Sequence, residues 1–341
     1  MQDILDTVGR WQRAHDQIGI ATVTTTWGSA PRREGAKMAF KADYAMIGSV
    51  SNGCIEGAVM DEGFLSFKSG KGHLLEYGLS NDDVLAVGLS CGGQIRVFVE
   101  PLNRQWWACL EPMIRSYIAA YTVTALSGDM TGEKVLFDSE MTPVYQTAGM
   151  TAETIREWAG LASGQTQSQE VQLSDYVVFV DAHIPPPHLV IIGGAHVAMP
   201  LHTMAKTLGF RVTLVDPRSA FASMERFPQV DTVLHQFPDE AFDTLKLDQH
   251  TYIAVLAHDP KIDDPALLTA LTTDIPYIGV MSSKRAHQER VARLRAKGVS
   301  DEQLARIHTP IGLSIESKTP EEIALSIMAQ IVAVKNGKSL C

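Results

Sequence analysis

The sequence is short of cysteine, of net positive charge and of long apolar runs. Its 341 residues include four cysteines, none in a C-x-x-C pair, so the spacing does not indicate a zinc site. The formal net charge of −10 argues against a general nucleic-acid-binding protein, because binding phosphates requires a concentrated basic surface. No segment holds about 18 consecutive apolar residues, so no membrane span is indicated.

The N-terminal segment, residues 1–17, lacks the continuous apolar stretch of a signal peptide. Ile4, Val8 and Trp11 instead recur at helical spacing among charged residues, which predicts an amphipathic helix. A chain without a secretory signal whose thiols lie far apart is expected in the cytoplasm, with its cysteines reduced.

The length exceeds that of a usual single-core domain, so we expect more than one domain. The clearest boundary is Pro185-Pro186-Pro187, because a proline run favours extended polyproline geometry and acts as a stiff spacer. We predict an N-terminal domain over residues 1–101, with cysteines in glycine-rich turns. A connecting α+β segment is expected over residues 102–187, and a C-terminal domain over residues 188–341.

The first two segments predict a mixed α+β arrangement. β-Branched and aromatic residues indicate strands, and apolar residues at helical spacing indicate helices. We expect strands at 20–27 and 36–40, a helix at 55–66, a helix at 106–119, a hairpin of strands 121–126 and 133–137 around Ser127-Gly128-Asp129, and a loop at 165–169.

The C-terminal segment alternates short apolar runs with helical patterns, which predicts a Rossmann-like, doubly wound parallel sheet. The final helix is well marked, with Thr319 as N-cap, Pro320 at its first position and Glu322 completing a capping box. We expect strands at 189–192, 211–215, 252–257 and 277–281, a weaker one at 231–235, and helices near 196–208, 239–246, 263–272 and 284–297.

Ligands of such sheets bind outside the carboxyl ends of the strands. Helix N-termini at that edge offer free N–H groups and the positive end of the helix dipole, which suit a phosphate. The residues expected there are Gly193, Gly194, Ala195 and His196 after the first strand, Asp216 after the second, His258 and Asp259 after a later strand, and Ser282, Ser283, Lys284 and Arg285 after the last.

The glycine turn departs from the G-x-G-x-x-G fingerprint, because Ala195 replaces the middle glycine. Asp216 lies 23 residues after Gly193, where an acidic residue would meet a ribose hydroxyl. We therefore expect a nucleotide or another phosphorylated ligand, in a geometry that differs from standard NAD binding. The alternative is a Rossmann-like domain that uses its crevice for packing or dimerisation.

For two other candidate regions, a ligand-binding role and a purely structural role are both compatible with the sequence. His258 and Asp259 could act as acid–base or ligand-orienting groups, or Asp259 could cap the following turn. The basic helix after Ser283 is largely a solvated face, and only Lys284 and Arg285 lie close enough to its start to contact a phosphate.

Cys54 and Cys91 lie beside glycines at turns, where side chains stay accessible. Cys54 directly precedes a helix, whose N-terminus lowers the pKa of a thiol. Either cysteine could equally be a small residue buried in a tight turn. Cys109 is expected in a helix core, and no role is assigned to the terminal Cys341.

Charged residues accompany the first of these turns. Arg32 and Arg33 follow Pro31 in a glycine-flanked loop and could form an anion clamp, or be solvated or paired with Glu34. Glu56 stands beside Cys54 and either caps the helix, which we favour, or tunes the thiol.

These residues resemble the XdhC/CoxI family, accessory proteins that mature molybdenum hydroxylases. The resemblance rests on the segments Gly28-Ser29-Ala30-Pro31-Arg32-Arg33, Asn52-Gly53-Cys54-Ile55-Glu56-Gly57, Cys91-Gly92-Gly93, Tyr277-Ile278-Gly279, Ala305 to Gly312 and Thr319 to Ala324. Two positions depart from the family pattern, Ser51-Asn52 and Ala195, where members commonly have glycine.

The resemblance implies an accessory protein that binds molybdenum cofactor, protects it during sulfuration and delivers it to the large subunit of a hydroxylase such as xanthine dehydrogenase. A cysteine desulfurase would be a second partner, a nucleotide on the cofactor is compatible with the fold, and a homodimer is expected. We expect the phosphate end at Gly193–Ala198 or Ser282–Arg285. Molybdenum would meet Cys54 or Cys91, because soft ligands suit such a metal.

Two other functions compete with this one. The first is an NAD(P)-dependent oxidoreductase, against which Ala195 counts. The second is a thiol-based sulfur-transfer enzyme that uses Cys54 and Cys91 for catalysis.

Overall fold

The structure, a computed structural model, describes residues 1–14, 16–29, 32–78 and 93–338. It divides into two compact units, Met1–Pro185 and Pro186–Cys341, and the division falls within the proline run. Across the described residues, no helix combines the length and the apolar character needed to cross a bilayer.

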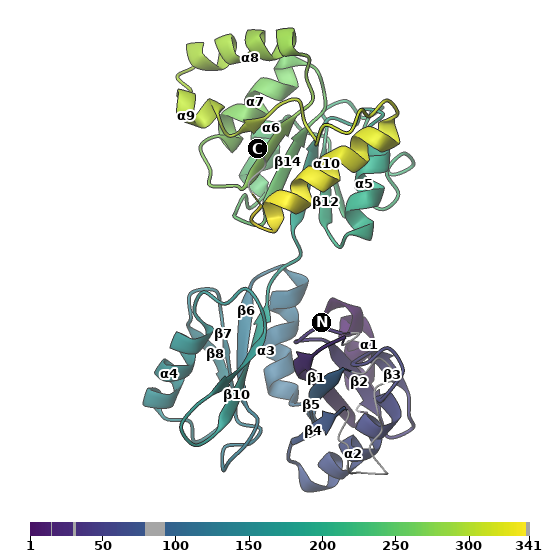
Figure 1. Ribbon diagram of the computed structural model, residues 1–341, viewed down its shortest axis with the longest axis vertical. Coiled ribbons are helices and arrows are strands. Elements are labelled where there is room, and N and C mark those ends of the chain that lie inside the picture. The colour runs from purple at the N-terminus through teal and green to yellow at the C-terminus, as the bar shows by residue number, and fades with distance from the viewer. Residues whose placement is uncertain (15, 30–31, 79–92, 339–341) are drawn as a thin grey trace. The chain divides into compact units, whose positions relative to one another are not determined.

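The first unit contains two five-stranded antiparallel sheets (Figure 1). The first sheet has the order β3-β2-β1-β5-β4, and its antiparallel pairing of β1 with β2 is the predicted return strand. Its elements are α1 (Gln2–Arg13), β1 (Ile18–Trp27), β2 (Lys37–Lys41), β3 (Met46–Gly48), α2 (Glu56–Ser69), β4 (His73–Tyr77) and β5 (Gln94–Pro101).

The segment that follows is a second sheet of the order β8-β7-β6-β10-β9. The predicted hairpin is its β6–β7 pair. Its elements are α3 (Arg104–Arg115), β6 (Ala120–Ala125), β7 (Lys134–Phe137), β8 (Pro143–Gln146), α4 (Ala152–Ala162), β9 (Gln169–Gln172) and β10 (Val177–His183).

A buried ion pair connects the two sheets. Lys37 on β2 contacts Asp181 on β10, with the ammonium nitrogen 2.5 Å from a carboxylate oxygen. Burial alone would raise the pKa of Asp181, but the charges of His183 and Lys37 outweigh it and hold the pKa at about 2. Because a charge left alone in this interior would be costly, the pair fixes which strands of the two sheets face each other.

The second unit is a six-stranded parallel sheet with helices on both faces, as the sequence predicted. Its strand order, β13-β12-β11-β14-β15-β16, is the Rossmann order 3-2-1-4-5-6. Its strands are β11 (His188–Ile192), β12 (Arg211–Val215), β13 (Thr232–Leu234), β14 (Thr251–Val255), β15 (Tyr277–Val280) and β16 (Ile307–His308). Its helices are α5 (Ala198–Thr207), α6 (Pro238–Thr244), α7 (Pro260–Ala270), α8 (Lys284–Ala296), α9 (Asp301–Leu304) and α10 (Pro320–Lys335).

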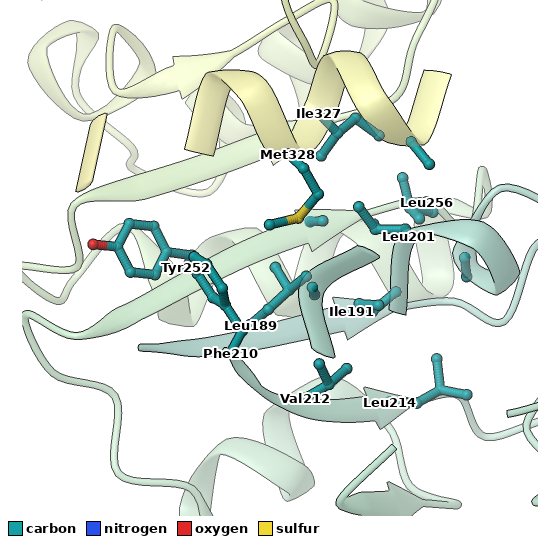
Figure 2. Close-up of a cluster of buried hydrophobic side chains, with 14 of the residues drawn as sticks. Leu189, Ile191, Leu201, Phe210, Val212, Leu214, Tyr252, Leu256, Ile327 and Met328 are labelled. Carbon is teal, nitrogen blue, oxygen red and sulfur yellow. The ribbon is translucent and has the colours of Figure 1, made fainter. Parts of the chain in front are cut away.

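Alternate residues of the central strands enter two separate cores. Leu189 and Ile191 of β11 pack under α5 and α10, while Val190 and Ile192 face the side of α6, α7 and α8. Figure 2 shows the first core, where Ile327 of α10 lies over Leu201 and Leu256. The cap of α10 is as predicted, with Thr319 and Glu322 forming a capping box.

The α10 contact gives a test of this core. Ile327 is fully buried, so Ile327→Ala should destabilise the second unit by about 2–4 kcal/mol, through lost apolar contact and the cavity left behind. Leu325 on the same helix is 53% exposed, and Leu325→Ala should cost less than about 0.5 kcal/mol. Urea unfolding of both variants measures the difference, and equal costs would contradict this packing.

Candidate functional site

The turn before α2, residues 49–55, is built around the carboxylate of Glu56. This side chain is buried and accepts hydrogen bonds on both oxygens. One oxygen accepts from Ser49 Oγ (2.6 Å), Val50 N (3.2 Å) and Ser51 N (2.9 Å), and the other from Ser51 Oγ (2.5 Å), Gly53 N (2.9 Å) and Ile55 N (3.3 Å).

These bonds fix the backbone on either side of Cys54. Asn52 and Gly53 both adopt positive φ angles, 59° and 108°, and the Cys54 N–H donates to Ser51 Oγ at 3.0 Å. The cysteine itself is exposed, at the point where α2 begins. Glu56 therefore organises the turn from the first position of the helix, whereas the capping role favoured from the sequence is not seen, because α2 has no side-chain cap.

The pKa of Glu56 follows from these contacts. Burial acts to raise it, but the hydrogen bonds from Ser49 and Ser51 outweigh burial and lower the pKa to about 2. The carboxylate stays ionised across the physiological range, so the turn keeps its shape there.

The other N-terminal candidates have different positions. Cys91 and Cys341 lie outside the described residues, and Cys109 is half-buried against the core of α1 and α3. Glu34 accepts hydrogen bonds from Thr26, at 3.0 Å from its N–H and 2.5 Å from its hydroxyl. In the same loop Arg33 is exposed and Arg32 is half-buried.

In the second unit, the predicted strand ends do meet along one edge of the sheet. Gly193, with φ at 97°, lies so close to the Ala257 backbone after β14 that an added Cβ would be 2.6 Å from it. Asp216 follows the neighbouring strand β12, and its carboxylate accepts a hydrogen bond from Gly194 N at 2.9 Å. The structure therefore brings the glycine turn, Asp216 and the end of β14 together.

Both glycine N–H groups are already used within the chain. Gly193 N donates to Val215 O, and Gly194 N donates to Asp216. Asp216 is fully buried and also accepts three hydrogen bonds from Arg218, two of them from the guanidinium. Burial acts to raise the pKa of Asp216, but these hydrogen bonds lower it on balance. As placed here, Asp216 stabilises its own turn, and both of its carboxylate oxygens are engaged with Gly194 and Arg218.

A segment after β12 covers the same turn. The Phe221 carbonyl oxygen lies 2.0 Å from where a Cβ on Gly194 would be, so only glycine fits at 194. Arg218 stacks on the Phe221 ring, with the guanidinium carbon 4.2 Å from the ring centroid. The Phe221 segment therefore packs directly against Gly194 of the glycine turn. His196, next along, is exposed.

Of the pair after β14, Asp259 caps α7. Its carboxylate accepts from Lys261 N at 2.9 Å. His258 has a φ angle of 59° and lines a pocket. Burial, and then the positive charge of Arg290, lowers the pKa of His258, so the ring is neutral at pH 7. His258 can therefore give or accept a hydrogen bond without adding charge.

Two pockets open at the ends of β14 and β15. The larger, of about 600 Å³, is lined by His258, Met281, Ser282 and Ser283, by residues 310–317, and by Ile323 and Ser326 of α10. The smaller, of about 210 Å³, is lined by Ser282, Lys284, His287, Gln288, Thr309 and Pro310. Arg285 does not line either pocket; it is exposed and pairs with Glu289 at 3.1 Å.

Residues 310–317 were not among the site residues expected from the sequence. The sequence did contain a sign of a turn here, because Gly312 and two serines precede the well-marked helix start at Thr319. Gly312 adopts a φ angle of 91°, and its N–H donates to Gln330 of α10, which turns the segment back along that helix. Its role as a pocket wall depends on this tertiary contact.

Within the described ranges, no cluster of three or more His, Cys, Asp or Glu side chains is arranged to hold a metal ion.

Two family models match the chain. One, for the XdhC and CoxI family, matches residues 11–78, and the other, for the XdhC Rossmann domain, matches residues 189–331. The first covers the Cys54 turn and the second covers the strand-end edge and most of the pocket walls. The chain belongs to the XdhC/CoxI family.

Three curated proteins are similar in sequence to this chain over more than nine-tenths of its length. It is 24% identical over 322 residues to a probable xanthine dehydrogenase subunit of Bacillus subtilis, covering 94% of each chain. It is 23% identical over 316 residues to the molybdenum cofactor insertion chaperone PaoD of Escherichia coli, covering 93% of this chain and 83% of PaoD. It is also 23% identical to the uncharacterized E. coli protein YqeB, and it spans 46% of that protein's length.

A solved structure agrees with the fold. A xanthine dehydrogenase from Bacillus halodurans superposes with a TM-score of 0.74 at 24% identity, covering 98% of this chain and 96% of that one. At this identity the similarity supports the fold.

The Glu56 turn predicts a specific acid sensitivity. The folded pKa of about 2 lies below the ordinary value of 4.5, so the stabilisation is complete above pH 4.5 and is lost as the pH falls toward 2. Glu56→Gln should cost about 1–3 kcal/mol at pH 7, and the difference from wild type should shrink below pH 4.5.

Urea unfolding between pH 7 and pH 3 measures this difference. Glu62→Gln, at an exposed position of the same helix, is the control and should change the stability little. A Glu56→Gln penalty that stays constant down to pH 3 would show that the carboxylate does not hold the turn through its charge.

Proposed function

We propose that this protein is a molybdenum cofactor chaperone, which binds the cofactor, protects it, supports its sulfuration and inserts it into a molybdenum hydroxylase such as xanthine dehydrogenase. The names of two relatives support this proposal, since they describe a molybdenum cofactor insertion chaperone and a probable subunit of xanthine dehydrogenase. Both match more than nine-tenths of this chain.

The observation that carries the proposal is the exposed Cys54 in a turn held by a buried carboxylate. A thiol on a fixed backbone can meet a metal centre without first ordering a loop, which removes an entropic cost of binding. Sulfur is also a soft ligand, suited to a cofactor whose metal already carries sulfur ligands. Cys91 is proposed as the second thiol.

The cofactor is cargo here, and the donor set fits that role. A resident metal site needs several protein ligands, whereas a carrier has to release what it binds. One or two thiols added to a metal that is already ligated give a contact that can be exchanged. The charged end of the cofactor would be held elsewhere on the chain.

The other parts of the proposal concern partners and assembly. We propose the large subunit of a hydroxylase as recipient, a cysteine desulfurase as sulfur source, a homodimer as the working form and the cytoplasm as its location. The residues 1–101, 102–187 and 188–341 are proposed as functional segments, with the first carrying the thiols and the last the phosphate end.

The competing oxidoreductase function is less well supported. A dinucleotide enzyme needs the glycine turn to receive a pyrophosphate, and in this chain Gly193, Gly194 and Asp216 are engaged with each other and with Arg218. The sulfur-transfer alternative uses the same two thiols and differs by forming a persulfide on one of them.

The thiol assignment gives the next prediction. A Cys54→Ala/Cys91→Ala variant, expressed with the native hydroxylase operon and purified, should carry at least about tenfold less molybdenum and pterin than wild type, because a direct metal contact is lost. Cys109→Ala, at a half-buried helix position, is the control and should retain the wild-type content. Metal analysis by mass spectrometry and pterin fluorescence give the readout.

Two other results would contradict the assignment of the thiols as metal contacts. Undiminished molybdenum in the double variant would remove the thiols from the proposed function. A persulfide on either cysteine after incubation with a cysteine desulfurase, without bound molybdenum, would favour the sulfur-transfer enzyme.

A further inference from the structure

The two pockets at the ends of β14 and β15 are adjoining compartments. Both are lined by Ser282, which follows β15, and by Pro310, so these two residues form a shared wall. Together they offer about 600 Å³ and about 210 Å³, which is enough for a ring system in one and a smaller group in the other.

The smaller compartment is positively polarised. Lys284 lines it, and Ser283 caps α8, so the first N–H groups of a 13-residue helix lie at its border. His287 lines it too, and its buried Nδ1 atom has no hydrogen-bond partner in the part of the chain that the structure describes. These groups suit an anion with several acceptor oxygens.

A buried arginine lies on the same helix, although it does not line either compartment. Arg290 follows His287 by three residues on α8 and is only 4% exposed. One of its terminal nitrogens donates to Asp263 at 3.1 Å, while its Nε and Nη1 atoms have no acceptor among the described residues. Buried donors of this kind are costly unless a ligand or water satisfies them.

The charge of Arg290 reaches both compartments. It lowers the pKa of His287 in the smaller one and of His258 in the larger one, in each case after the effect of burial. Burial raises the pKa of its partner Asp263 to about 6, so near pH 7 this carboxylate is still mostly ionised and offsets most of the charge of the arginine. The preference of the smaller compartment for a negatively charged group therefore comes mainly from Lys284 and from the start of α8.

The larger compartment has the opposite character. The described residues that line it include no Lys or Arg, and its walls combine aliphatic side chains, such as Met281 and Ile323, with serines and with one acidic residue, Glu316. Apolar walls with a few hydroxyl groups suit an uncharged heterocycle that stacks and makes some hydrogen bonds.

We propose that the two compartments form one site for a phosphorylated heterocycle, with the ring in the larger and the phosphate between Lys284, His287 and the start of α8. The identity of the ring as a pterin rests on the function proposed above, whereas recognition of the phosphate does not. Between the two anchors considered from the sequence, this site is chosen because the N–H groups of Gly193 and Gly194 are already engaged.

Guanosine 5′-monophosphate is a suitable probe, because guanine shares the 2-amino-4-oxopyrimidine edge of a pterin. Isothermal titration calorimetry of the full chain should show that it binds at least about tenfold more tightly than guanosine, since a charge-assisted phosphate contact contributes this much. Inorganic phosphate should compete with it.

Two variants separate the compartments. Lys284 is exposed, so Lys284→Glu should fold normally and reduce the affinity for the nucleotide to that for guanosine. Ser314 is an exposed wall residue, and Ser314→Trp should fill the larger compartment and weaken nucleotide and nucleoside alike. Lys297→Glu, just beyond the other end of α8, is the charge-matched control and should bind as wild type does.

Equal binding of nucleotide and nucleoside, or nucleotide binding unchanged by Lys284→Glu, would overturn the proposal. The molybdenum content of the wild-type chain distinguishes the two levels of inference. A chain that carries molybdenum but does not bind the nucleotide would contradict this site and would still support the proposed function. Nucleotide binding in the expected pattern by a chain that carries no molybdenum would support this site and contradict the proposed function.

Discussion

A buried carboxylate that accepts hydrogen bonds from a glycine-containing turn fixes the shape of one turn in each unit. Such a carboxylate is stable only when its acceptor sites are filled, so it imposes a shape on the turn around it. In the first unit Glu56 does this and leaves Cys54 exposed at a helix start. In the second unit Asp216 does it with Gly194 and Arg218.

Much of the fold could be predicted from the sequence. The apolar runs of the second unit are short, and the helix signals between them are clear, so the doubly wound sheet followed from periodicity and caps. Thr319, Pro320 and Glu322 placed the last helix correctly, because capping depends on residues close together in the chain. The hairpin around Gly128 followed for the same reason.

The parts that could not be predicted depend on contacts between distant residues. Nothing local shows that Lys37 and Asp181 join two sheets, or that Phe221 covers Gly194. Asp216, the acidic residue after the second strand, was expected to bind a ribose hydroxyl. Its carboxylate instead accepts a hydrogen bond from Arg218. The wall formed by residues 310–317 likewise exists only because Gly312 is bonded to Gln330.

The first unit thus carries a fixed thiol turn and the second a two-compartment pocket, and each is proposed as a ligand-contact site. The most direct test mixes the cofactor-loaded chain with a molybdenum-free hydroxylase and follows the molybdenum content of both proteins together with the hydroxylase activity. For a chaperone of this kind, molybdenum should leave the chain and activity should rise in proportion. Molybdenum that stays on the chain, or activation that free cofactor achieves equally well without it, would contradict a role in delivery.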